Sequence, residues 1–126
     1  MTPTTLHRIH RLCHRAWTLH GAELGLSYAE FEYLSVIHDE AERMRIEDAH
    51  GQHLQDIVTA LGVAKPSASA MIAKLEGRGL VTRFQCKQDA RAQHIILTTD
   101  GEALRRRGLA LYDDIARHAE QQDART

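Results

Sequence analysis

The side chains most suited to chemistry in this chain are basic ones concentrated between Ala64 and Arg91. This segment has six basic and two acidic residues, a net charge of +4, although the whole chain has a net charge of −1. The preceding segment, Glu23 to Asp56, has nine acidic and two basic residues, a net charge of −7. A local excess of positive charge favours binding to nucleic-acid phosphates, with an affinity that falls as salt is added. An ordinary solvated face is the alternative.

Two short helices are predicted just before and within this positive segment. Apolar residues from Leu54 to Leu61 follow the 3.6-residue period of a helix, which breaks at Gly62. A second helix is predicted to open at Pro66, because proline suits the first helical position, where its missing N–H would be unpaired in any case. Two helices separated by about three or four residues, with a glycine in the turn, are typical of a helix-turn-helix.

The second helix has the properties of a helix that reads DNA. Ser67 and Ser69 place hydroxyl groups near the positive N-terminus of the helix, where a phosphate can bind. Alanines keep the helix thin enough to enter a major groove about 12 Å wide, where residues near the helix N-terminus meet base edges. We therefore expect base contacts from Pro66, Ser67, Ser69 and Ala70, and a backbone contact from Lys74.

A β-hairpin is predicted after this helix. Two glycines end the helix, and β-rich runs over Leu80–Cys86 and Gln93–Thr98 flank a polar loop. A hairpin in this place is the wing of a winged helix. Arg91 near its tip is placed to enter a minor groove, and Asp89 to hold that guanidinium by a charge-assisted pair. The residues predicted to bind DNA are Lys65, Pro66, Ser67, Ser69, Ala70, Lys74, Arg83, Lys87, Asp89 and Arg91.

The run GLVTRFQCKQDARAQHIILTTDGEAL, from Gly79 to Leu104, combines a Gly-Leu-Val start, an Asp-x-Arg-Ala element and a later Leu-Thr. In this order and spacing it resembles the wing and following helix of the MarR (multiple-antibiotic-resistance regulator) family. Upstream, Leu26, Ser27, Phe31 and Leu34 resemble the second helix of that family. The resemblance implies a sequence-specific transcription regulator that binds double-stranded DNA as a homodimer, most often a repressor that an effector releases from DNA.

Two positions depart from the pattern of that family. Ala64 stands where the family usually has a serine that caps the recognition helix, and Ala90 stands where it usually has a second arginine. Both changes remove expected DNA contacts. They leave open an alternative function, a winged-helix protein-interaction module with reduced DNA binding that engages another protein through its acidic lobe.

Amphipathic helices are predicted at both ends of the chain, over residues 1–25 and 100–122. Their apolar side chains recur at helical spacing and offer more surface than one small domain can cover. The resemblance implies that these helices interleave between two subunits, giving a two-fold dimer suited to a pseudo-palindromic operator. Packing within one subunit is the alternative. Dimer contacts are predicted for Leu6, Ile9, Leu104, Leu111 and Ile115.

The predicted fold is therefore mainly α with a small β-hairpin wing. It is a winged helix-turn-helix with terminal dimerisation helices, a single domain over residues 1–126. The helix-turn-helix and wing occupy residues 53–98. A length of 126 residues with 43% hydrophobic content is enough for one helix-rich core and too short for two.

Nine histidines raise the hypothesis of a divalent metal site. His10, Cys13 and His14 lie at helical spacing, so that one helix face would present three ligands of the kinds that zinc accepts. The chain has no Cys-x-x-Cys or His-Glu-x-x-His pattern, and solvated or packed histidines are the alternative. A metal-sensing regulator of the same fold is thus a second form of the functional prediction.

A small aromatic compound is the other candidate effector. In the family that the chain resembles, the effector pocket lies between the dimer helices and the DNA-binding lobe. That position implies a pocket lined by Trp17, His20, Phe31 and Tyr33. Packing of these rings in a core or dimer contact is the alternative interpretation.

Other functional classes find little support in the sequence. It contains no Gly-rich phosphate loop, no Gly-x-Ser-x-Gly elbow and no setting that would separate the pKa values of two carboxylates, so we do not expect an enzyme. No signal peptide or long apolar run is present, so we expect a cytoplasmic protein that does not contact membranes. Cys13 and Cys86 lack a pairing motif, which fits a reducing compartment. Redox sensing by Cys86 is a further alternative to a structural role in the strand.

Overall fold

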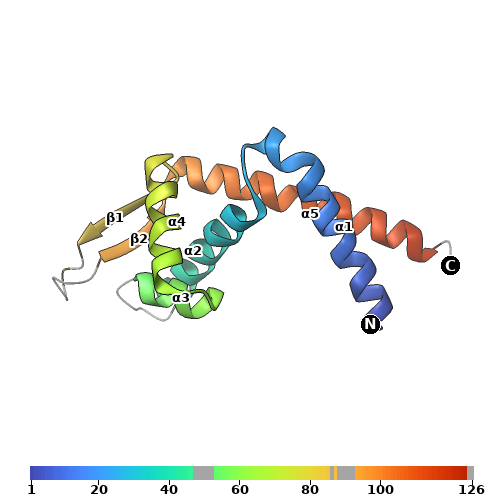
Figure 1. Cartoon of the computed structure of the whole chain (residues 1–126), viewed down its shortest axis with the longest axis horizontal. Helices are drawn as coiled ribbons and strands as arrows, with labels where there is room; N and C mark the ends of the chain where they lie inside the picture. Colours follow the sequence, from blue (N-terminus) through green and yellow to red (C-terminus); the bar gives the residue numbers. More distant parts are fainter. Residues whose placement is uncertain (47–52, 86, 88–92, 125–126) are drawn as a thin grey trace. The chain divides into compact units, whose positions relative to one another are not determined.

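The structure is a computed structural model that describes residues 1–46, 53–85, 87 and 93–124 (Figure 1). Along the chain it has helices α1 (Pro3–Leu24), α2 (Tyr28–Ile46), α3 (Leu54–Leu61) and α4 (Lys65–Gly77), strands β1 (Val81–Gln85) and β2 (Gln93–Leu97), and helix α5 (Thr99–Ala124). This order confirms the predicted fold class. None of the described helices is both long enough and apolar enough to span a membrane.

The chain divides into two units. The first comprises residues 1–28 and 106–126, and the second comprises residues 29–105. Helix α5 therefore contributes its beginning to the second unit and its remainder to the first. The helix-turn-helix and the hairpin both lie in the second unit. The single-domain organisation stays a prediction.

Local hydrogen bonds explain where the helix-turn-helix begins and turns. The backbone N–H of His53 donates to Asp56 Oδ2 at 2.8 Å, which fixes the start of α3. Gly62 ends α3 with a φ of 67°, and its N–H donates to the carbonyl of Val58 at 2.9 Å. Helix α4 then begins at Lys65, one residue earlier than predicted, with Pro66 in its first turn. Helices α3 and α4 pack on one another.

The hairpin is antiparallel and is fastened to the start of α5. Its register runs from Val81 opposite Leu97 to Gln85 opposite Gln93. The Thr98 hydroxyl donates to the carbonyl of Gly79 at 2.6 Å and accepts the N–H of Gly101 at 3.0 Å. This one side chain therefore joins the turn after α4, the end of β2 and the first turn of α5.

Glycine is required at position 101 by the closeness of that junction. A Cβ atom there would lie 2.0 Å from the carbonyl oxygen of Leu80, far inside van der Waals contact. The Leu80 carbonyl itself accepts the N–H of Thr98 at 3.0 Å, so it is not free to move away. The glycine of the Thr-Asp-Gly run thus lets the wing and α5 meet.

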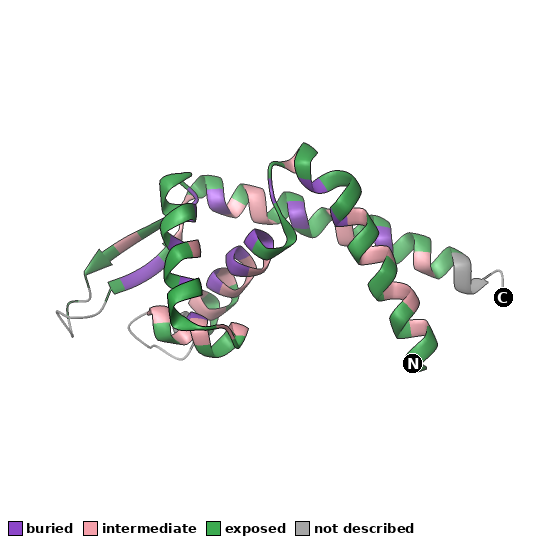
Figure 2. Cartoon of the chain, in the orientation of Figure 1, coloured by how far each residue is buried: buried purple, intermediate pink, exposed green. Residues whose placement is uncertain are grey.

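The core of the second unit is built from aliphatic side chains of α2, α3, α4 and β2. Figure 2 shows buried positions on each of these elements. Burial of each such side chain stabilises the fold by about 1.5–3 kcal/mol. The largest fully buried side chains are Leu34, Ile37, Ile57, Ile72, Leu75 and Ile95.

The first unit has a smaller core centred on Trp17. The indole Nε1–H of Trp17 donates to the Tyr112 hydroxyl at 3.0 Å, and the indole meets Tyr28 edge-on, with ring centroids 5.9 Å apart. Leu26 and Ile115 are also buried in this unit. The rings link α1, the start of α2 and the later part of α5.

Candidate nucleic-acid interface

Helix α4 has one anchored face and one exposed face. Ala68, Ile72 and Leu75 are completely buried, at the four- and three-residue steps that mark one side of a helix. Ala68 was predicted to keep the outer surface thin, but its methyl group instead belongs to the core. The side chains left on the exposed face near the N-terminus are Lys65, Pro66, Ser67, Ser69 and Ala70.

The N-terminus of α4 carries no negative charge and no side-chain cap. Ala64 occupies the N-cap position without a side-chain hydrogen bond, and no acidic residue lies in the first turn. A serine hydroxyl here would accept an N–H of the first turn. Without it, the positive end of the helix dipole lies beside the exposed hydroxyls of Ser67 and Ser69, an arrangement that favours an anion such as a phosphate.

Lys74 of α4 and Arg78, the C-cap residue of α4, both pair with a carboxylate of α2. Arg78 Nη1 donates to Glu30 Oε2 at 2.5 Å, and Lys74 Nζ lies 3.7 Å from the same oxygen. Lys74 was predicted to contact the DNA backbone. The structure places it in an ion pair with α2, although 60% of its side chain remains exposed to solvent.

Arg83 on β1 is also paired. Its Nη2 donates to Glu76 Oε1 at 2.9 Å, joining the first wing strand to the last turn of α4. This hydrogen bond lowers the pKa of Glu76 below its usual value. Arg83 was predicted to bind DNA, and the structure shows it oriented by a carboxylate of the preceding helix. Lys65 and Lys87 are exposed, and neither forms an ion pair with a residue that the structure describes.

The wing is joined to α3 by a stack of rings that the sequence did not predict. The His94 ring on β2 stacks on Phe84 of β1 and also meets His53 at the start of α3, with both centroid distances 4.9 Å. Strand alternation places His94 on the same face as the exposed Thr82 and Ile96, yet His94 is buried. The rings of Phe84 and of His53, a residue 41 positions earlier, cover it, and sequence periodicity carries no signal for the contact with His53.

Part of the predicted wing lies outside the described residues. Asp89 and Arg91, predicted as a minor-groove pair, fall there, as do Ala90 and Cys86. The proposed roles of these residues stay predictions. The described part of the interface is thus the exposed face of α4, Arg83 and Lys87.

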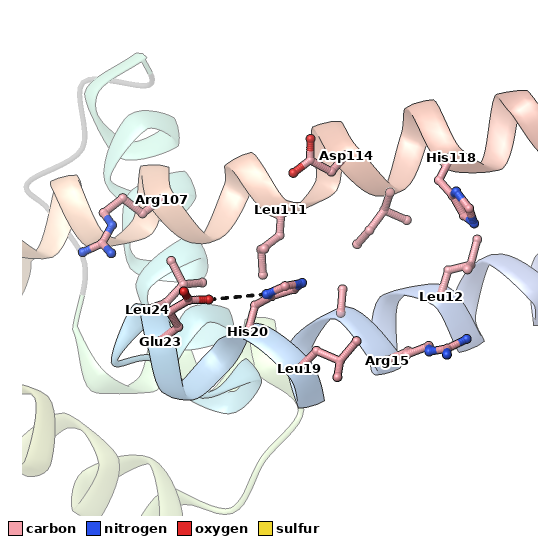
Figure 3. Close-up of a pocket in the computed structure, with 12 residues that line it drawn as sticks. Leu12, Arg15, Leu19, His20, Glu23, Leu24, Arg107, Leu111, Asp114 and His118 are labelled. Atoms are coloured by element: carbon pink, nitrogen blue, oxygen red, sulfur yellow. Dashed lines mark ion pairs between the residues drawn. The ribbon is translucent and has the colours of Figure 1, made fainter.

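The first unit contains an apolar groove between α1 and the later part of α5 (Figure 3). Its volume is 740 Å³. The His20 imidazole points into it and lies 3.6 Å from the Glu23 carboxylate. The lining residues are Leu12, Arg15, Ala16, Leu19, His20, Glu23, Leu24, Arg107, Leu111, Asp114, Ile115 and His118.

The predicted dimer residues occupy different environments. Leu6 is exposed and Leu111 lines the groove, as a contact with a second subunit would require. Ile9 is half-buried within the protomer. Ile115 is already buried within the protomer, so it supports the first unit itself, and Leu104 belongs to the second unit. Leu19, which is not among the predicted dimer residues, is one of the most exposed leucines.

The four residues of the predicted effector pocket divide between the two units. Phe31 and Tyr33 are buried in the second unit, and burial raises the pKa of the Tyr33 hydroxyl. Trp17 is buried in the first unit against Tyr112, whereas His20 reaches the groove. Trp17, Phe31 and Tyr33 are thus packed within the protomer, and the effector pocket stays a prediction. Trp17 also borders a second recess of 440 Å³ that includes Tyr28 and Gly21.

The structure does not assemble the predicted metal site. Among the described residues, which include His10, Cys13 and His14, no three His, Cys, Asp or Glu side chains lie close enough together to hold a metal ion. Cys13 is half-buried, and this burial raises the pKa of its thiol, while the two histidines are exposed. Helical spacing alone brought these residues to adjoining turns without making their donor atoms converge.

Comparison with known proteins identifies relatives of this arrangement. The sequence pattern of the MarR family matches residues 26–92. A mutant of S. aureus MepR has a similar structure, with a TM-score of 0.78 and 22% identity over 97% of this chain and 85% of that one. Mutant MarR from E. coli complexed with operator DNA has a TM-score of 0.73 and 20% sequence identity, over 93% of this chain and 78% of that one. CouR from Rhodococcus jostii RHA1 bound to p-coumaroyl-CoA has a TM-score of 0.66 and 23% sequence identity, over 87% of this chain and 71% of that one.

Proposed function

Because this chain belongs to the MarR family, and is thus a DNA-binding transcription regulator rather than an enzyme, we propose that it is a ligand-responsive repressor that binds its operator as a homodimer. The observation that carries this proposal is the exposed face of α4. Its small side chains, hydroxyls and Lys65 surround a helix N-terminus without acidic residues. Such a surface fits a major groove and the phosphates beside it.

The roles of two α4 residues follow from their chemistry. Ser69 presents a hydroxyl that can exchange hydrogen bonds with base edges, whereas Lys65 presents a point charge suited to phosphate. Ser69→Ala should change the preference between operator sequences. Lys65→Ala should weaken binding to all duplexes alike and reduce the salt dependence by about one counterion.

Fluorescence anisotropy tests this proposal with a duplex from the region upstream of the coding sequence and a scrambled duplex of equal length. The proposal expects tighter binding to the upstream duplex, and the two variants should differ in the way just described. Equal effects of both variants on both duplexes would contradict the assigned roles. Failure to bind any duplex, even at low salt, would favour the protein-interaction module instead.

The groove of the first unit supports the homodimer. Its floor is apolar, and Leu19 at its edge has 64% of its surface exposed within one protomer. Helices of a second subunit would cover Leu19 and the other leucines of the groove. Two subunits related by a two-fold axis would match two operator half-sites about one helical turn apart. Intersubunit packing therefore explains an apolar surface that the protomer leaves open.

Leu19→Lys tests the dimer without disturbing a buried side chain. We expect sedimentation to show a dimer for the parent protein and a monomer for this variant, with operator affinity lost together with the dimer. Ile96→Lys is the matched control for the sedimentation measurement, since Ile96 is an exposed apolar residue on the wing that does not line the groove. A dimer that persists in Leu19→Lys would refute the use of this groove.

A small aromatic compound is our proposed effector. CouR is a structural relative that binds p-coumaroyl-CoA, and the recess beside Trp17 has a volume within the range of small-molecule sites. An effector that prefers the non-binding arrangement would shift the population away from DNA. Trp17 is the only tryptophan, so its fluorescence reports directly on this recess. Aromatic acids that release operator DNA without changing this fluorescence would place the effector elsewhere.

A further inference from the structure

Glu30 is an acidic side chain in an unusual position. It lies in the first turn of α2, and only 7% of its side chain is exposed. Its Oε2 atom accepts a hydrogen bond from Arg78 at 2.5 Å and lies 3.7 Å from Lys74 Nζ. Lys74 lies in the last turns of α4 and Arg78 is the C-cap residue that follows it, so one carboxylate contacts two cations four residues apart at the end of this helix.

The burial of this carboxylate argues for a specific geometric role. A carboxylate loses strong hydration when it is buried, so such a group is retained where charged partners meet it closely. Arg78 is only 36% exposed, whereas Lys74 is 60% exposed, so the closer partner is also the more buried one. Apolar packing at this place would bury α4 equally well, but it would not select one rotation of α4 about its axis.

The contacts of α4 show what that rotation decides. Ala68, Ile72 and Leu75 are packed inward, and the exposed hydroxyl of Ser69 follows Ala68 directly in the sequence. All three inward side chains are apolar, and apolar contacts tolerate small rotations of the helix about its axis. The hydrogen bond to Glu30 is directional, so it favours one rotation of α4 about its axis over neighbouring ones.

We propose that Glu30 is a positioning residue for DNA recognition. Its carboxylate fixes the rotation of α4 on α2 through Arg78 and Lys74, and thereby sets the direction of the side chains that meet base edges. This inference rests on the proposed function and adds a specificity-determining residue that does not itself touch DNA. The alternative is that Glu30 acts only as one negative charge near a basic helix.

Paired DNA titrations separate the two roles. Glu30→Ala should lower affinity for the operator about tenfold, the size of effect that an indirect positioning contact can have. Affinity for a scrambled duplex should stay unchanged or rise slightly, because a negative charge near the phosphates is removed. If operator and scrambled affinities change by the same factor, or if neither changes, the positioning role is wrong.

Four further variants complete the set: Glu32→Ala, Arg78→Ala, the double variant Glu30→Ala/Arg78→Ala, and Glu30→Gln. Glu32→Ala is the matched control, because it removes the same charge from the same helix without touching the ion pair, and it should leave the ratio of affinities unchanged. Arg78→Ala alone should also lower operator affinity, and adding it to Glu30→Ala should cause no further loss, since both remove one interaction. Glu30→Gln keeps the shape and an oxygen acceptor for Arg78, and it should restore most of the operator affinity. Additive losses, or a Glu30→Gln variant as weak as Glu30→Ala, would contradict the proposal.

Amide hydrogen exchange tests the same claim without DNA. Glu30→Ala should accelerate exchange in the last turn of α4 about tenfold, while α3 stays as in the parent protein and Glu32→Ala has no effect. Unchanged exchange in α4 overturns the inference. If the parent protein binds no operator but amide exchange in α4 responds as expected, the proposed function fails, whereas the role of Glu30 in fixing α4 on α2 stands.

Discussion

In residues 29–105, six large aliphatic side chains are completely buried, whereas residues 1–28 and 106–126 leave several leucines open along a groove of 740 Å³. The second unit also satisfies its buried charge internally, through the pairing of Glu30 with α4. The first unit relies on one hydrogen-bonded aromatic group around Trp17. We infer that the DNA-reading surface is prepared within one chain and that the terminal helices are completed by a second chain.

The largest effect is expected where the second unit is most tightly constrained. Gly101→Ala should destabilise the protein by about 3 kcal/mol, because its Cβ would overlap the Leu80 carbonyl and force the wing away from α5. Gly77→Ala is the control, since a Cβ there meets no atom within 4 Å. Urea unfolding measures the free energy of unfolding of both variants. Equal stability of the two variants would mean that the junction is not rigid.

Truncation in the first unit should act on association rather than on folding of the protomer. Leu6 is 60% exposed in one chain, so Leu6→Ala should cost little within the protomer. If a second chain buries it, the dimer should be weakened by about 2 kcal/mol, roughly a thirtyfold rise in the dissociation constant. Sedimentation equilibrium gives this constant. An unchanged constant would remove Leu6 from the predicted interface.

A cap at the start of α4 should strengthen the second unit moderately. Ala64→Ser supplies the hydroxyl that the N-cap lacks, so we expect a gain of about 1 kcal/mol in unfolding free energy. Ala73→Ser is the control: it adds the same hydroxyl to an exposed position inside α4, where serine costs about 0.5 kcal/mol. Thermal unfolding compares the two. A loss of stability in Ala64→Ser would show that the N-cap geometry differs.

The smallest effect concerns the ion pair between α2 and α5 in the second unit. Burial alone would raise the pKa of Glu102, but the hydrogen bond from His38, with a ring nitrogen 2.7 Å from Oε1, and the nearby Arg105 lower it overall. Because the folded pKa lies below the ordinary value of 4.5, the pair stabilises the fold above that pH, and its contribution is lost as pH falls through the folded pKa. Glu102 is partly exposed, so we expect about 1 kcal/mol or less.

The free energy of unfolding, measured between pH 3 and 7 for the parent protein and for Glu102→Gln, checks this prediction. Glu102→Gln should lose stability at neutral pH and approach the parent protein in acid, because the parent then carries a neutral side chain too. A constant difference between the two proteins across this range would contradict the assigned cause.

Much of the second unit followed from local sequence signals. The apolar period of α3, the glycine at position 62 and the proline at position 66 located the helix-turn-helix to within a residue. The β-rich runs located both strands to within a residue at each end. These features are read from neighbours in the sequence, where propensity and capping act.

Contacts between distant residues were not predictable in the same way. Glu30 and Arg78 are 48 residues apart, and each alone resembles an ordinary solvated charge. Arg83 and Glu76 are only seven residues apart, but they lie on a strand and a helix whose relative placement the local sequence does not give, so a cation predicted to bind DNA was found oriented by a carboxylate. Among the described residues His10, Cys13 and His14 do not converge on one point, since adjoining turns of a helix do not by themselves bring donor atoms together.

The central claim is that two copies of the exposed α4 face read one duplex. Methylation protection of guanines on the operator, with purified full-length protein, tests it most directly. We predict two protected patches in successive major grooves, centred about ten base pairs apart, which both disappear in the monomeric Leu19→Lys variant. A single patch, or protection that Leu19→Lys leaves intact, would contradict the account.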